Sequence, residues 1–171
     1  NTNETLGNLQ DVVNNYAALD FLPELTDSTS EKPSFVFFVN ELTHEPNYLQ
    51  APDYVPLSEV TNKGSGIFAQ DVHYHANIAA LKRLGEFFEY LKENNLYDNT
   101  KIIITADHGA PLNNNICPEQ GKANLPFRIE AYNPLLLVKD FNAHGSLQTD
   151  HTFMTNADTP ALALKDINDQ A

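Results

Sequence analysis

The chain has 171 residues, a hydrophobic fraction of 42% and a formal net charge of −13 at pH 7. This length and apolar content suffice for one globular domain with a buried core, and they argue against intrinsic disorder. The acidic balance would repel a nucleic-acid backbone, so we expect no nucleic-acid partner. The apolar runs are short, and none approaches the roughly 18–20 residues that a membrane span needs.

The first half of the chain predicts a helix, a strand and a long loop. Apolar residues in Asp11–Leu25 recur at helical spacing, and Pro23 marks the end of this helix. Ser34–Asn40 is an unbroken apolar run between Pro33 and a polar exit, which is typical of a strand buried on both faces. Thr43–Gly66 is rich in Pro and Gly and has little periodicity, so we expect an irregular loop there.

The second half predicts two further strands between helices. In chain order, the expected elements are a helix over Val72–Asn95, a buried strand over Lys101–Ala106, a polar loop over Pro111–Phe127, a strand over Pro134–Val138 and a helix within Phe153–Lys165. Buried strands that alternate with helices indicate an α/β fold. We therefore expect one domain over residues 1–171, with a mixed, mostly parallel sheet flanked by helices.

The first two predicted strands both end at a histidine beside an acid. His44 follows the first strand, and Asp107-His108-Gly109 follows the second. Ligands of α/β folds collect at the carboxyl ends of strands, and carboxylate oxygen with imidazole nitrogen suits zinc or manganese. Gly109 would permit the unusual backbone angles that turn both side chains toward one ion. Taken alone, an Asp-His pair is more often structural, and Thr43–Pro46 is more often a capped turn.

Residues 74–109 resemble the signature stretch of the sulfatase-like branch of the alkaline phosphatase superfamily. In that branch a Tyr opens a long helix, and a Leu-Tyr-Asp-Asn-Thr turn, an Ile/Val strand and Asp-His-Gly follow. Phe35–Pro46, Asn133–Val138 and Asp158–Leu162 resemble further segments of the family, so the resemblance covers nearly the whole chain. The two strand exits look most like those of lipoteichoic acid synthases and phosphoethanolamine transferases, which are membrane-anchored lipid-headgroup transferases.

The resemblance implies roles for individual residues. Asp107 and His108 would bind the catalytic divalent ion, for which manganese, zinc, magnesium and calcium are all candidates. His44 would contact the charged group of a phosphate- or sulfate-ester substrate, with a lipid headgroup among the candidate substrates. Arg128, which precedes the third predicted strand, is a further candidate for binding the substrate anion.

The chain also departs from the family pattern. The family places a Thr, Ser or modified Cys nucleophile and an acidic metal ligand well before the first strand seen here. The sulfatase signature Cys-x-Pro-x-Arg is absent, because Cys117-Pro118 is not followed by an arginine. We therefore expect the C-terminal part of a catalytic domain, without a catalytic nucleophile and inactive alone. The resemblance implies a membrane anchor upstream and an extracytoplasmic location in a bacterium.

Two hypotheses compete for the complete protein. It is either a metal-dependent phosphoryl- or sulfuryl-group transferase or hydrolase, or a binding or structural module that has kept the fold and lost the chemistry. The cofactor-independent phosphoglycerate mutase branch is a third possibility, and the helix and turn over Tyr74–Thr100 argue against it. His73, His75 and His144 are expected to be solvated or supporting residues, and His151 either approaches the site or has an exposed capping role.

Overall fold

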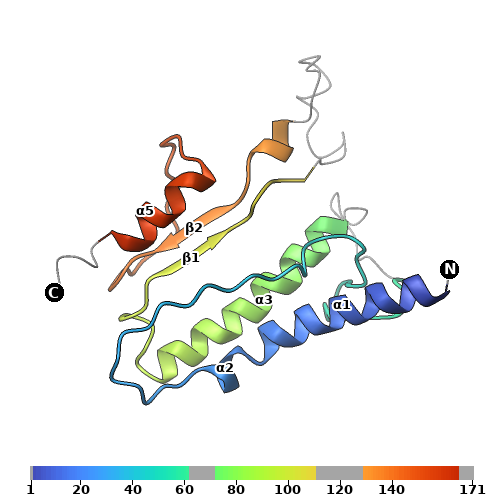
Figure 1. Cartoon of the computed structure of the whole chain (residues 1–171), viewed down its shortest axis with the longest axis horizontal. Coiled ribbons are helices and arrows are strands. Elements are labelled where there is room, and N and C mark those ends of the chain that lie inside the picture. The colour runs from blue at the N-terminus through green and yellow to red at the C-terminus, as the bar shows by residue number, and fades with distance from the viewer. Residues whose placement is uncertain (1, 62–71, 111–128, 166–171) are drawn as a thin grey trace.

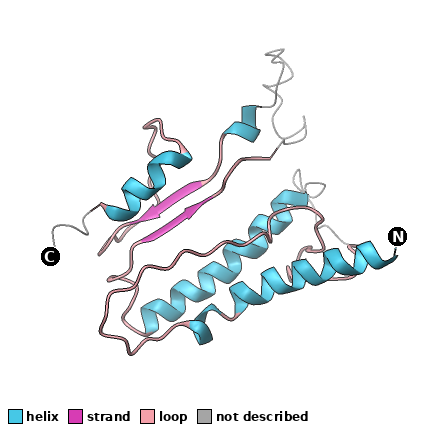
Figure 2. Cartoon of the chain, viewed as in Figure 1, coloured by secondary structure: helices cyan, strands magenta, loops and turns pink. Residues whose placement is uncertain are grey.

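The computed structural model describes residues 2–61, 72–110 and 129–165 (Figure 1). The elements run in the order α1 (Thr2–Asp20), α2 (Leu22–Leu25), α3 (Val72–Glu93), β1 (Ile102–Thr105), η1 (Ile129–Tyr132), β2 (Leu136–Lys139), η2 (Asn156–Asp158) and α5 (Thr159–Leu164). The predicted helices and the second and third predicted strands are confirmed, although the first helix begins earlier than expected. In Figure 2, α1 and α3 lie on one side of the strand pair and α5 lies on the other.

The two strands form an antiparallel pair. Its register runs from Ile102 opposite Lys139 to Thr105 opposite Leu136. An α/β fold is compatible with this arrangement, but the mostly parallel sheet expected from the sequence is not seen in the described residues. The expected burial of β1 on both faces is also wrong, since its three isoleucines are only half-buried. A pair of four-residue strands is too narrow to cover itself on both faces.

The core lies between α1 and α3 and the loop that follows residue 40. Val12 and Leu19 of α1 are seven residues apart and share one helix face, which packs against Ala76 and Ala79 of α3. Leu42, from the loop, is 1% exposed and completes this cluster. The burial of a leucine two residues before His44 fixes the start of the loop that carries the histidine.

The segment Ser34–Asn40 does not form the predicted buried strand. No strand is assigned to it, and its five apolar side chains are exposed by between 44% at Phe38 and 82% at Phe37. The prediction was wrong because no segment of the described residues pairs with this backbone or covers its side chains. Only its end is anchored, since the Asn40 amide donates to the Asn15 carbonyl of α1 at 2.8 Å.

Of the two predicted long loops, only the first lies partly within the described residues. The described part of Thr43–Gly66, up to residue 61, has no helix or strand, which confirms the predicted irregular loop. The predicted loop Pro111–Phe127 and the candidate Arg128 lie outside the described residues. Across the described ranges, no helix combines the length and the apolar composition that crossing a bilayer requires.

Candidate functional site

The end of β1 presents Asp107 and His108 to solvent. Backbone bonds hold both sides of this pair, because Ala106 N–H donates to Leu135 at 3.0 Å and Gly109 N–H donates to Ala131 at 2.9 Å. The side chains of Asp107 and His108 are 89% and 67% exposed. The chain thus turns sharply between two fixed points, and both predicted metal ligands project outward from the turn.

Hydrogen bonding determines which nitrogen of His108 is available. Its Nδ1 lies 2.7 Å from the backbone carbonyl of Gly109. A carbonyl can only accept, so Nδ1 carries the proton, and in the neutral ring Nε2 keeps its lone pair. This orientation by a backbone carbonyl is the usual support of a metal-binding histidine.

The donor atoms of Asp107 and His108 fit a shared divalent ion. Asp107 Oδ2 and His108 Nε2 are 3.7 Å apart. Two ligand atoms at ordinary zinc distances in a tetrahedral site stand about 3.4 Å apart, so a small adjustment would bring both onto one ion. The other carboxylate oxygen, Oδ1, accepts the His108 backbone N–H at 2.9 Å, which fixes the carboxylate plane. Two donors are fewer than such ions require, and the described residues contain no group of three or more potential ligands.

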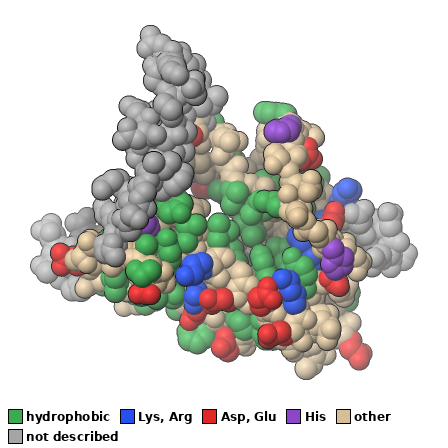
Figure 3. All heavy atoms as spheres, turned by 180° about the vertical axis from the view of Figure 1, so that it is seen from behind, with side chains coloured by type: hydrophobic (Ala, Val, Ile, Leu, Met, Phe, Trp, Pro, Cys, Tyr) green, Lys and Arg blue, Asp and Glu red, His purple; other side chains and the backbone are tan. Residues whose placement is uncertain are grey.

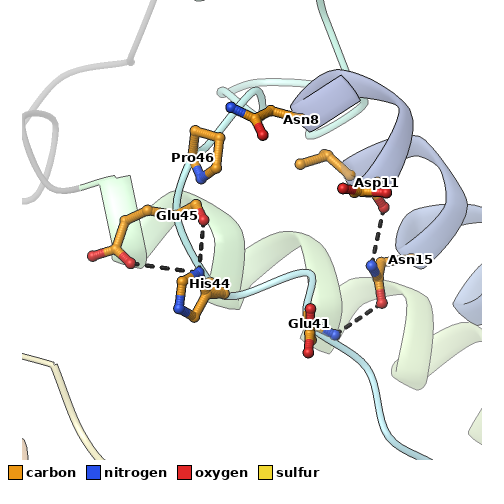
Figure 4. A pocket seen from close by; sticks show the side chains of 8 residues that line it. Asn8, Asp11, Asn15, Glu41, His44, Glu45 and Pro46 are labelled. Atoms are coloured by element: carbon orange, nitrogen blue, oxygen red, sulfur yellow. Dashed lines mark hydrogen bonds and ion pairs between the residues drawn. The ribbon is translucent and has the colours of Figure 1, made fainter. Parts of the chain in front are cut away.

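His44 repeats the same hydrogen-bond arrangement. Its Nδ1 lies 2.6 Å from the carbonyl of Glu45, so this nitrogen donates and Nε2 is left for a ligand. Figure 4 shows Nδ1 directed at Glu45, with the other ring nitrogen turned away from Asp11 and Asn15. This hydrogen bond is the main cause that raises the pKa of His44, and the negative charges of Glu45, Glu41 and Asp107 add to it. The contribution of Asp107 couples the loop that carries His44 electrostatically to the end of β1.

Glu45 also contacts the start of α3, and no pattern in the sequence predicts this contact. Glu45 Oε1 lies 3.0 Å from His73 Nε2, while Oε2 lies 3.7 Å from His44 Nδ1. His73 therefore supports the loop that carries Glu45, which is one of the two roles expected for it from the sequence. His75 is not solvated, because it is 3% exposed and its ring lies against Tyr54 and Tyr74. The burial of His75 was not apparent from the sequence, because its packing partner Tyr54 is distant in the chain.

A pocket lies on the other side of His44. It is lined by Asn8, Asp11, Val12, Asn15, Glu41, His44, Glu45 and Pro46 (Figure 4). Three of these side chains are carboxylates, and they would repel a sulfate or phosphate group. We therefore do not expect the substrate anion to bind in this pocket.

Asn156 supports the Asp-His pair from the far end of the chain. Its side-chain amide donates to the Asp107 carbonyl at 2.6 Å, across 49 residues of sequence. A capping box between Thr155 and Asp158 fixes the turn that carries Asn156. The sequence offered the helix start but no sign of this contact. His144 is exposed, as predicted, and His151 is also exposed.

Gly109 is needed for space rather than for unusual backbone angles. Its φ is not positive, and a Cβ built on it would lie 2.0 Å from the Glu130 carbonyl oxygen. The sequence-based reason for this glycine was therefore wrong.

We expect Gly109→Ala to lower the free energy of unfolding by about 3 kcal/mol, because backbone would have to move. Gly85→Ala is the matched control, since nothing lies within 4 Å of its Cβ position in α3. The control should be neutral or stabilise by up to about 1 kcal/mol. Urea denaturation measures both, and equal midpoints would contradict the packing argument.

Comparisons with known proteins identify the family of the chain. The family model described as Sulfatase matches residues 3–165. The human N-acetylgalactosamine-6-sulfatase is 29% identical over 110 residues, which are 64% of this chain and 18% of that protein. The chain thus corresponds to less than a fifth of the length of this relative. No solved structure matches the chain. Because the family match covers nearly every residue, the chain belongs to the sulfatase family.

Proposed function

We propose that this chain forms one side of the active site of a metal-dependent sulfatase-like enzyme that acts on sulfate or phosphate esters. The observation that carries the proposal is the shared orientation of His44 and His108. In each ring Nδ1 donates to the carbonyl of the next residue, so each Nε2 is available for a ligand. Histidines that serve only to cap a turn have no need of this arrangement in both loops.

Each residue has a distinct role in the proposed reaction. Asp107 Oδ2 and His108 Nε2 would hold the divalent ion, which would polarise the ester and activate the attacking hydroxyl. His44 donates from Nε2 to a non-bridging oxygen of the ester and stabilises the charge that develops there. Its raised pKa favours the cationic donor, and Glu45 holds the ring through both its carbonyl and its carboxylate.

The remaining parts of the site are proposed to lie outside residues 1–171. The supporting facts are that the described residues contain no group of three or more potential metal ligands and that the matched relative is far longer than this chain. The nucleophile and the acidic ligands would come from that part of the protein. The name of the relative favours a sulfate ester, whereas the strand exits resemble lipid-headgroup phosphotransferases. The second resemblance would place the protein outside the cytoplasm of a bacterium, anchored in its membrane.

A module without catalytic activity is the second candidate function. The incomplete ligand set is the observation that favours it. The upstream part of the native reading frame distinguishes the two functions. A Thr, Ser or Cys after a strand, with an acidic residue before it, supports the enzyme, and the absence of both supports the module.

The 171-residue chain alone should bind manganese weakly and turn over neither p-nitrophenyl sulfate nor p-nitrophenyl phosphate. Two donors leave most of the coordination shell to water, so we expect a dissociation constant of about 1 mM or weaker. Calorimetry measures the binding, and His108→Ala should abolish what little there is. Micromolar affinity or clear turnover would contradict the proposal that the rest of the site lies elsewhere.

A further inference from the structure

The turn that carries His44 is fixed by contacts with α1. The His44 N–H donates to the Glu41 carbonyl at 3.0 Å, which closes a turn over Glu41–His44. The segment before this turn gives it little support, because the side chains of Phe35–Val39 are exposed and its backbone bonds to no other backbone group of the described residues. The described elements leave much apolar surface uncovered, as Figure 3 shows for one face of the molecule. Within the described residues, the place of His44 therefore depends on the contacts of the turn itself.

Asn15 of α1 bonds to the first residue of this turn. Its Oδ1 accepts the Glu41 N–H at 2.9 Å, and its Nδ2 donates to the Asp11 carbonyl at 3.0 Å. Figure 4 shows the Asn15 side chain between these two partners. Because a carboxamide oxygen only accepts and its nitrogen only donates, the two bonds together fix one orientation of the side chain. Glu41 is thus bonded to α1 through its N–H and to His44 through its carbonyl.

Asn40 forms a second link between the turn and α1. Its Nδ2 donates to the Asn15 carbonyl at 2.8 Å, and its Oδ1 accepts the Leu42 N–H at 3.0 Å. Asn15 and Asn40, which we call the asparagine clamp, therefore bind the N–H groups of the first two residues of the turn. The clamp fixes the backbone ahead of His44, whereas the hydrogen bond to the Glu45 carbonyl fixes the orientation of its ring.

The position of Asn15 in α1 is unfavourable for a residue that serves the helix alone. It lies three residues after Val12 and four before Leu19, so it shares the helix face that these two residues bury against α3. Asparagine has a lower helix propensity than alanine, and a core-facing position of an amphipathic helix favours an apolar side chain. Asn15 meets neither preference, and its hydrogen bond to Glu41 supplies the physical reason for a carboxamide here.

We infer that Asn15 is a positioning residue for His44. The inference rests on the proposed function, in which Nε2 of His44 donates to the ester, and it adds the contact that holds this donor in place. Asn15 acts through the turn and needs no contact with the substrate. A displacement of about 1 Å in an active site can lower the rate by about a hundredfold. Loss of the clamp would release the turn from α1 and allow such a displacement.

A double-mutant cycle in the complete protein tests this inference. Asn15→Ala should lower kcat by about 10- to 100-fold, because His44 is no longer held in place. In the His44→Ala background the same substitution should change kcat by less than about twofold, since the residue that it positions is gone. Equal losses in the two backgrounds would mean a general weakening of the fold and would overturn the inference. A normal kcat of Asn15→Ala would overturn it as well.

The chain offers a matched control and a second variant. Asn14→Ala removes the same type of side chain from the next position of α1, where the carboxamide is exposed and accepts from Gln10 of the same helix, and it should keep normal turnover. A loss in Asn14→Ala equal to that in Asn15→Ala would contradict the inference. Asn40→Ala breaks the clamp from the loop and leaves α1 intact. It should show the same non-additive loss with His44→Ala, which keeps the test decisive if Asn15→Ala does not fold.

Amide hydrogen exchange of the 171-residue chain, measured by NMR, gives a readout that does not depend on turnover. The His44 amide bonds to Glu41 and so reports on the turn itself. Asn15→Ala should speed its exchange by about tenfold or more, whereas the Leu57 amide, which donates to the Tyr48 carbonyl in the same loop, should be unchanged. Unchanged exchange at His44, or equal acceleration at both amides, would overturn the inference. If the complete protein is inactive but Asn15→Ala still loosens the turn, the proposed function fails and the positioning contact stands.

Discussion

Replacing His108 by alanine in the complete protein should lower turnover by about a thousandfold or more. Loss of the Nε2 donor removes one of the two expected metal ligands among the described residues, and metal stabilisation of the developing charge amounts to several kcal/mol. Since 67% of the side chain is exposed, the fold should be retained. Steady-state kinetics with saturating manganese measures the loss, and circular dichroism checks the fold.

The control for this variant is His144→Ala. Its side chain is 69% exposed, close to the value for His108, and it lies in a turn after β2 beside Asp98. The control should keep normal turnover. Near-normal turnover of His108→Ala would refute the assignment of this residue to the metal, whereas an equal loss in both variants would point to a general effect of removing a surface imidazole.

Replacing His44 by alanine should lower turnover by about 10²- to 10³-fold, the range seen when one donor to a developing oxyanion is removed. The hydrogen bond to the Glu45 carbonyl fixes the orientation of the ring, so the variant would lose a donor that is already positioned. Because His44 is expected to contact the substrate and not the ion, manganese affinity should be unchanged. Kinetics and metal titration on the same variant separate the two roles, and a parallel loss of metal affinity would contradict this one.

The pH profile gives a second readout of His44. Its pKa is raised, first by the hydrogen bond to the Glu45 carbonyl and then by the surrounding carboxylates. The cationic donor is therefore fully present below the ordinary histidine pKa and is lost as the pH rises through the raised value. Turnover of the complete protein should fall over that alkaline window, and His44→Gln should flatten the fall because glutamine donates without titrating. A fall of the same shape in His44→Gln would assign the titration to another group.

The sequence predicted those parts of the fold that local pattern controls. Apolar spacing in α3 and the proline near the start of α5 indicated both helices, since amphipathicity and capping are properties of neighbouring residues. The failure at Ser34–Asn40 has a different origin. Its unbroken apolar composition is typical of a strand that is buried on both faces. A strand also needs neighbouring strands to pair with, and the described residues provide none for this segment. Apolar composition predicts that a segment will be buried, whereas strand pairing depends on which other segments lie beside it in the fold.

The residues of the candidate site were proposed from the sequence, but the contacts that support them were not. Resemblance pointed to Asp107, His108 and His44, and the roles of these residues stay predictions. The contacts of Glu45 with His73 and of Asn156 with Asp107 join segments 28 and 49 residues apart. No periodicity or motif in the sequence encodes such pairs, because they arise only when separate elements pack. Gly109 shows the same limit, since the carbonyl that excludes a side chain belongs to η1.

The hydrogen bond from Asn156 to Asp107 limits how far the C-terminal end of this chain can be truncated. The carbonyl that it holds belongs to the residue whose carboxylate is expected to face the ion, so the turn at η2 is part of the scaffold of the site. The capping box that shapes this turn needs Asp158 as well as Thr155. The shortest version of the chain with an intact strand exit must therefore extend past residue 158, well beyond the last residue expected to bind a ligand.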